Sequence, residues 1–309
     1  MIMKRLTLLF LLPFLCFMSL TPVRAESEAP AVQMESKTYP LSGFDALDVS
    51  WTFQVELTQS PDYSVVVEAP DFILPYLDVR VRKSCLKLGV SDASRDIRKR
   101  LEKGNYRIVA RVSMPALSGL DMSGATKLEA NGSFRSAKDE FGLELSGAAE
   151  VKSLTVSARC GEIDCSGASK FVLDGDFESL EIDLSGAANG KMKSSGNNAD
   201  IDLSGSSKLF LEGRYQYVKA EAGGAASAEM KGTADRLVFE GSGAAKGQFL
   251  ECPARQARVD LSGASKLRLE VEEDLSVRLS GAASCQYRAG DRFTLSSTDV
   301  SRGATLKRL

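Results

Sequence analysis

The sequence contains no histidine in its 309 residues. Histidine is the usual base that activates a serine or cysteine nucleophile, and it is the commonest metal ligand in proteins. Its absence excludes Ser-His-Asp and Cys-His catalysis, together with nearly every type of catalytic zinc site. We therefore expect a protein that is not an enzyme and that carries no cofactor or metal.

Cysteine is also scarce. Of the six cysteines in the chain, Cys16 lies in the N-terminal apolar segment, and the others are Cys85, Cys160, Cys165, Cys252 and Cys285. Five cysteines thus remain outside that segment, and this odd number leaves at least one thiol unpaired. Their spacings match no zinc-binding pattern. A framework of disulfides therefore does not organise this fold.

Long apolar segments are absent except at the start of the chain. Lys4 and Arg5 precede an apolar run over residues 6–20, and small residues follow up to Ala25. The run is too short to span a membrane. This pattern predicts a signal peptide at 1–25 and a linker at 26–36. The protein is therefore expected to be exported, to the periplasm, the outer-membrane surface or the cell exterior.

The charge balance argues against a nucleic-acid partner. Residues 1–25 hold three basic and no acidic residues, so their removal changes the formal net charge from −2 to −5. Nucleic-acid-binding domains normally carry a strong basic field. The one basic segment, residues 94–104, is most simply a solvated loop or short helix, with a phosphate or polysaccharide patch as the alternative.

What the chain has in abundance is one recurring phrase. "IDLSGSSKLFLEG" at 201–213 is one of nine similar segments, each centred on a glycine in an SGA-like tripeptide. These corner glycines are Gly124, Gly147, Gly167, Gly186, Gly205, Gly224, Gly243, Gly263 and Gly281. Their spacing is short and nearly constant, which predicts a solenoid in which each repeat forms one turn.

Apolar residues alternate with polar ones on both sides of each corner glycine. Around Gly205, for example, Ile201, Leu203 and Leu211 occupy the apolar positions. This alternation is typical of strands with one buried face, and nineteen residues leave no room for a helix between them. The sequence predicts an all-β, right-handed parallel β-solenoid with coils of about 19 residues and about 4.8 Å between coils. A doubled coil, which contains two repeats as unequal halves, remains an alternative.

The tripeptide itself is interpreted as a structural corner. Glycine permits backbone angles that other residues avoid, and small neighbours allow corners to stack closely. The serine before the glycine recurs in eight copies with no base beside it, which does not fit a nucleophile. Four residues after the glycine, large residues such as Phe171 and Leu209 alternate with small ones such as Gly190, as interdigitating core layers require.

The region before the repeats is less regular. Residues 46–57, "ALDVSWTFQVEL", resemble a degenerate coil with Trp51 in the glycine position. Further strand-like segments follow up to residue 117. We expect residues 37–117 to form an irregular β cap that blocks edge-to-edge association, continuous with solenoid repeats over 118–309.

These features together resemble a known bacterial family. "FDALDVSWTFQVELTQ" at 44–59, the ladder of "LSGAA" and "LSGASK" phrases, and the ending "DVSRGATLKRL" are similar to the autotransporter adhesins with a head GIN domain, which are frequent in Bacteroidetes. The resemblance covers residues 44–309. It implies a secreted right-handed β-helix of pectin-lyase-like shape with an adhesin-like role, and it supplies no catalytic residues.

A column of acidic residues is the candidate binding feature. Three residues before the corner glycines stand Asp121, Glu144, Asp164, Asp183, Asp202, Glu221, Glu240 and Asp260, and Arg278 ends the series. Of these, Asp164, Asp183, Asp202 and Asp260 are the candidate binding residues. Strand parity predicts that the column faces outward, as does a second column formed by Lys127, Lys170, Lys208, Lys246 and Lys266. The pattern is interpreted as an acidic edge balanced by a lysine edge, with a calcium site as the alternative.

Three functions follow from these observations. The favoured one is a non-enzymatic secreted or cell-surface protein that binds a glycan or a surface protein along its length. The alternatives are a passive structural module of the cell envelope and a polysaccharide-cleaving enzyme. The acidic residues recur in successive coils and do not form one distinct pair, which argues against the enzyme.

Overall fold

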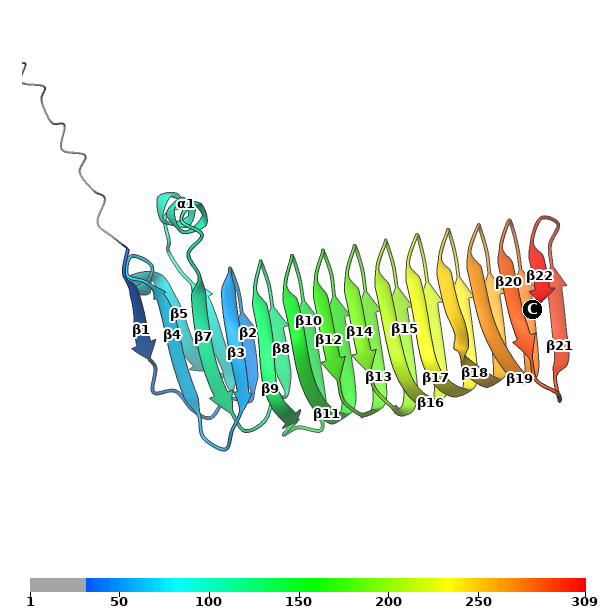
Figure 1. Cartoon of the computed structure of the whole chain (residues 1–309), viewed down its shortest axis with the longest axis horizontal. Helices are drawn as coiled ribbons and strands as arrows, with labels where there is room; N and C mark the ends of the chain where they lie inside the picture. Colours follow the sequence, from blue (N-terminus) through cyan, green and yellow to red (C-terminus); the bar gives the residue numbers. More distant parts are fainter. Residues whose placement is uncertain (1–31) are drawn as a thin grey trace, which may run out of the picture. The chain divides into compact units, whose positions relative to one another are not determined.

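The structure, a computed structural model, describes residues 32–309, and Gln33–Leu309 form one compact unit. Coils of β-strand stack along this unit, as Figure 1 shows. The expected signal peptide and most of the expected linker lie outside the described residues. Strand β1 (Met34–Thr38) begins within the last residues of that linker. In the described part of the chain, no helix has both the length and the apolar character needed to cross a membrane.

The N-terminal part mixes strands with two short helices. After β1 come β2 (Ala46–Val49), β3 (Phe53–Gln59), β4 (Ser64–Pro70), the 3-10 helix η1 (Leu74–Tyr76), β5 (Leu77–Arg82), β6 (Cys85–Val90), α1 (Arg95–Lys103) and β7 (Ile108–Met114). The basic segment 94–104 is thus a short exposed helix, with the Ser94 hydroxyl accepting from the Ile97 N–H at its start.

The repeats contain only strands. They are β8 (Gly119–Met122), β9 (Lys127–Arg135), β10 (Glu140–Leu145), β11 (Glu150–Cys165), β12 (Lys170–Asp174), β13 (Phe177–Leu184), β14 (Asn189–Lys193), β15 (Gly196–Leu203), β16 (Lys208–Ala222), β17 (Ser227–Gly241), β18 (Lys246–Leu261), β19 (Lys266–Leu279), β20 (Ser284–Ala289), β21 (Thr294–Val300) and β22 (Thr305–Arg308).

Each coil has two sides. Side 1 consists of the segments that run toward the corners: β2, β6, β8, β10, β13, β15, β21 and the C-terminal halves of β11 and β16–β19. Side 2 consists of the segments that run away from them. On side 1, Ile163 pairs with Ile182 and Ile182 with Ile201, all in parallel. These partners hold the same position in successive repeats, so one repeat forms one coil. The pairing confirms the predicted parallel solenoid and decides against the doubled coil.

The corner glycines have a positive φ, and the adjacent coil leaves no room for a side chain at their positions. Their φ values in the nine repeats lie between 67° and 81°. The Ala188 N–H donates to the Ser185 carbonyl (3.2 Å), which closes a turn with positive φ at its first central residue, as in a type II′ turn. The Ala168 N–H also donates to the Gly147 carbonyl of the preceding coil (2.7 Å). Successive corners are therefore hydrogen-bonded to each other.

The core lies between the two sides and runs along the whole stack. Its inward side chains, such as Leu184 and Leu203, are almost completely buried. Large and small residues interdigitate, because a Cβ on Gly190 would lie 2.4 Å from the Phe171 ring and 3.1 Å from the Leu209 side chain. Gly190 thus leaves room for the large residues of the coils before and after it.

The segment around Trp51 is a coil of the solenoid, as its sequence predicts. Trp51 has a φ of 77°, and β2 and β3 pair in parallel with β8 and β9. A Cβ on Gly124 would lie 2.5 Å from the Trp51 carbonyl oxygen. The coil of β2 and β3 therefore stacks directly against the first repeat, although the whole segment from β4 to β7 separates the two in sequence.

Those intervening residues close this end of the stack. β6 and β7 pair with the free edges of β2 and β3, and helix α1 takes the place of their corner (Figure 1). β4 and β5 then pair antiparallel with β7 and β6. The chain between β4 and β5 connects the two sides, and its Ile73 is fully buried. The region 37–117 thus contains the antiparallel cap that a solenoid end requires.

The opposite end has one more coil than the nine sequence repeats predict. The Ser301 N–H donates to the Leu279 carbonyl, as the Ser280 N–H does to the Leu261 carbonyl one coil earlier. Arg302 therefore occupies the corner position, and Gly303, with a φ of 99°, follows it. The glycine is displaced by one residue, which explains why the repeat spacing did not reveal this coil.

Candidate functional site

A row of nine carboxylates, one from each of nine consecutive coils, runs along the outer surface of side 1. They are Asp48, Asp121, Glu144, Asp164, Asp183, Asp202, Glu221, Glu240 and Asp260, each paired in register with the next. We call them the acidic file. It ends at Lys87, which pairs with Asp48, and at Arg278, which pairs with Asp260.

Eight of these residues follow from the sequence repeat, and Asp48 does not. The first repeat and the coil that holds Asp48 are adjacent in space but separated in sequence by the cap, so a constant period could not reveal their contact. All four candidate binding residues, Asp164, Asp183, Asp202 and Asp260, belong to the file. Its members are exposed or half-buried, and neighbouring strands are about 4.8 Å apart.

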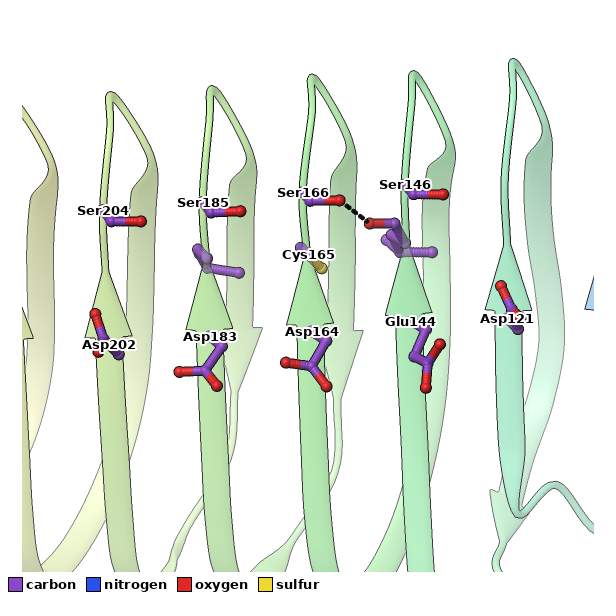
Figure 2. A pocket seen from close by; sticks show the side chains of 12 residues that line it. Asp121, Glu144, Ser146, Asp164, Cys165, Ser166, Asp183, Ser185, Asp202 and Ser204 are labelled. Carbon is purple, nitrogen blue, oxygen red and sulfur yellow. Dashed lines mark hydrogen bonds between the residues drawn. The ribbon is translucent and has the colours of Figure 1, made fainter.

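A groove runs beside the acidic file. Figure 2 shows the carboxylates of five coils below a row of serine hydroxyls that includes Ser146, Ser166, Ser185 and Ser204. The backbone of residues such as Leu184 lies between them, and the groove has a volume of about 490 Å³. A second stretch of about 410 Å³ continues past Asp202 along Glu221, Glu240 and Asp260. We call the two stretches together the acidic groove.

The central carboxylates of the file have no ion-pair partner among the described residues. Only Glu221, with Lys219, and Asp260, with Arg278 at 3.3 Å, form ion pairs. Glu162, Glu181 and Asp200 lie two residues before Asp164, Asp183 and Asp202, on the same outer face, and increase the negative charge there. The groove therefore concentrates uncompensated negative charge on its central coils.

Side 2 is different, because several of its acidic and basic side chains form ion pairs with each other. Lys127 lies 3.1 Å from Glu150, and Lys231 lies 2.8 Å from Glu251, each pair bridging adjacent coils. The lysine column predicted from sequence is exposed on this side. The two outer faces thus differ in electrostatic character: side 1 carries an open negative strip, and side 2 a surface on which both charges are present.

Crowding of the carboxylates affects their proton affinity. Burial raises the pKa of Asp121, and the negative charges of Asp48 and Glu144 raise it further. Burial likewise raises the pKa of Asp183, followed by the charges of Asp164 and Asp202. At these two positions, burial and neighbouring like charges both disfavour the ionised carboxylate.

The family of the chain is now clear. The model of the family described as "Putative auto-transporter adhesin, head GIN domain" matches residues 43–194 and 188–290. The chain belongs to this family. No curated protein matches this head GIN protein in sequence.

Solved structures share the fold at low sequence identity. A "putative adhesin" from Parabacteroides merdae is 12% identical with a TM-score of 0.51, and the match covers 90% of this chain and 96% of that one. A second "putative adhesin", from Parabacteroides distasonis, is 13% identical with a TM-score of 0.53, covering 90% and 97%. At these identities the likeness establishes the fold of the head GIN protein.

The described residues of the head GIN protein hold no group of three or more acidic, cysteine or histidine side chains placed to bind a metal. The carboxylates follow a line and do not converge, so they lack the six or more oxygens that surround calcium. Cys165, Cys252 and Cys285 are buried, and burial raises the pKa of each thiol to about 12. These thiols are packed as small apolar side chains and are not reactive groups.

The raised pKa of Asp183 leads to a pH-dependent prediction for the head GIN protein. Asp183 binds a proton more readily in the folded chain than in the unfolded one, so its contribution to stability falls as pH rises above about 4. We expect Asp183→Asn to have an unchanged or slightly higher melting temperature at pH 7, and this gain should disappear near pH 4. The measurement is thermal unfolding of both proteins between pH 4 and 7. Asp174→Asn on side 2 is the control, and a lower melting temperature for Asp183→Asn at pH 7 would contradict the assigned repulsion.

Proposed function

We propose that the protein is a non-enzymatic, adhesin-like binding protein that presents the acidic groove to an extended glycan or protein partner. The observation that supports this is the repetition of a carboxylate, accompanied in most coils by a serine hydroxyl, along an open groove. A ligand with its own linear repeat could form equivalent hydrogen bonds in many coils at once. Weak contacts repeated in this way combine into a strong overall interaction.

The groove suits an extended ligand better than a small molecule. Sites for small molecules are enclosed pockets with a few convergent polar groups. Here the polar groups are distributed along eight coils and face solvent. The lack of histidine and the absence of a distinct carboxylate pair argue against hydrolysis, and the family description names an adhesin, not an enzyme.

Export fits this proposal. The expected signal peptide at 1–25 and the adhesin family both favour a protein of the periplasm, the outer-membrane surface or the cell exterior. In these compartments extended polysaccharides and surface proteins are available as partners.

Binding of the purified protein to glycan arrays and to surface-protein extracts tests the proposal. The triple variant Asp164→Asn, Asp183→Asn and Asp202→Asn should weaken binding at least tenfold, because hydrogen bonds to charged groups contribute about 1.5–3 kcal/mol each. The matched control removes three exposed carboxylates outside the groove, with Asp174→Asn, Glu229→Gln and Asp235→Asn, and should bind normally.

Three results would reject this function. If neither array nor extract contains a ligand, the passive structural module is the better description. If the triple variant binds as tightly as its control, the ligand is bound outside the acidic groove. Release of reducing ends or unsaturated sugars from a polysaccharide would instead establish an enzyme.

A further inference from the structure

The two ends of the solenoid differ in whether further strands cover the last coil. At the N-terminal end, antiparallel strands flank the last parallel coil, and Ile73 lies fully buried over the core. At the other end, β21 and β22 form the last coil, which we call the end coil (residues 294–308). In the described chain, β21 pairs only with β19 among the earlier coils, and β22 only with β20. The outer edges of both strands are therefore open.

The open edges carry unpaired backbone groups at defined positions. The Ser301 N–H points toward β19, because it donates to the Leu279 carbonyl. Successive residues of a strand point to opposite edges, so the backbone groups of Val300 point outward. On β22, the N–H groups of Thr305 and Leu309 point inward to the preceding coil, so those of Leu306 and Arg308 point to the open edge.

Apolar side chains accompany these edges. Leu295, Val300 and Leu309 are 39%, 37% and 48% exposed, and they are three of the five large exposed apolar residues in the described chain. Leu295 and Val300 continue the inward columns of Leu275 and Leu279, which are buried only because the end coil covers them. The core of the solenoid is thus uncovered at this end.

We propose that two copies of the chain join through their end coils, related by a twofold axis parallel to the strands. β21 runs toward the corner and β22 runs away from it, so such an axis places β21 of one copy against β22 of the other in antiparallel orientation. The pair forms twice, once on each side, as an isologous interface requires. The two cores then cover each other.

Charge and backbone orientation select one register. With Val300 opposite the partner's Leu306, both residues direct their backbone groups across the interface and their side chains toward the joined core. The next position places Asp299 opposite the partner's Lys307. These two residues form a non-hydrogen-bonded pair, in which antiparallel side chains approach most closely. Because Asp299 lies on β21 and Lys307 on β22, the end coil of one copy is complementary in charge to the end coil of a second copy.

A second copy explains the end coil better than stacking on the opposite end of another molecule. That opposite end presents the outer edges of β1 and β5 in an antiparallel cap, where Ile73 is already buried. Leu295 and Val300 would find no open core there to cover. Another copy's end coil offers both an open core and the opposite charge.

Sedimentation of the full chain at tens of micromolar tests the interface with two complementary variants. Asp299→Lys places like charges opposite each other in its own dimer, as does Lys307→Asp, so each variant alone should be monomeric. In an equimolar mixture, lysine faces aspartate at both pairs, and a heterodimer should form. The chain with both substitutions should also dimerise.

The overturning results are equally definite. A monomeric wild-type chain, single variants that still dimerise, or a mixture that stays monomeric would each reject the proposed interface. Asp299 also lies 3.9 Å from Arg278 of its own copy, so circular dichroism of each variant must match that of the wild type. If Asp299→Lys fails to fold, Lys307→Asp and the doubly substituted chain still decide the question.

Discussion

Leu203→Asp is expected to unfold the protein or to destabilise it by about 4 kcal/mol or more, because an aspartate there would place an unpaired carboxylate in an apolar interior. Leu203 is completely buried, in register between Leu184 and Ala222 of the adjacent coils. The loss persists even if the carboxyl group takes up a proton, since a neutral carboxyl without hydrogen-bond partners is also costly to bury. Denaturant unfolding followed by circular dichroism measures the effect.

The matched control is Phe210→Asp, seven residues along and on the outside of side 2. Phe210 is half-buried, and its ring centre lies 5.9 Å and 5.8 Å from the ammonium groups of Lys191 and Lys231. An aspartate there would remain at the solvent-facing surface, with Lys191 and Glu229 as its in-register neighbours and Lys231 nearby, so its charge is partly compensated and we expect a change within about 1 kcal/mol. Equal losses for both variants would show that the inward and outward columns are wrongly assigned.

Gly205→Val is expected to destabilise the solenoid by about 2–5 kcal/mol, because it combines backbone strain with a steric clash between coils. Gly205 has a φ of 70°, which a β-branched residue strongly disfavours. Its Cβ would also lie 2.7 Å from the Gly186 carbonyl oxygen, so the two corners would have to move apart. That oxygen accepts a hydrogen bond from the Ser206 N–H, and separation of the corners would weaken it.

Ser206→Val provides the control at the next position of the same corner. Ser206 is exposed and is not among the residues with positive φ, so a valine side chain would extend into solvent. We expect a change below about 0.5 kcal/mol. Thermal unfolding of the two variants tests whether the loss comes from the need for glycine at position 205 or from any valine in the corner. Similar melting temperatures would show that glycine is not specifically required.

Much of the fold could be predicted because each repeat is defined by residues that are close together in the sequence. The position of Ile201 and Leu203 before Gly205, and of Leu211 after it, defines two strands and a corner without reference to any other coil. Repetition of that pattern at a nearly constant period then permits one parallel stack. Strand parity likewise predicts that Asp183 and Asp202 face solvent, where the structure places them. Trp51 was assigned to a corner by the same local pattern.

The tertiary structure decided what depends on contacts between distant segments. The position of Asp48 next to Asp121 follows from the insertion of the cap between two adjacent coils, and no period in the sequence encodes it. The end coil escaped the repeat because Arg302 replaces the glycine, and only its hydrogen bond to the preceding coil identifies it. The physical reason is that the pattern of apolar and polar residues determines which side chains of a strand point to the core. Which strands lie next to each other is determined instead by which backbone edges form hydrogen bonds. The continuity of the acidic groove and the open edge of the end coil belong to this second kind of information.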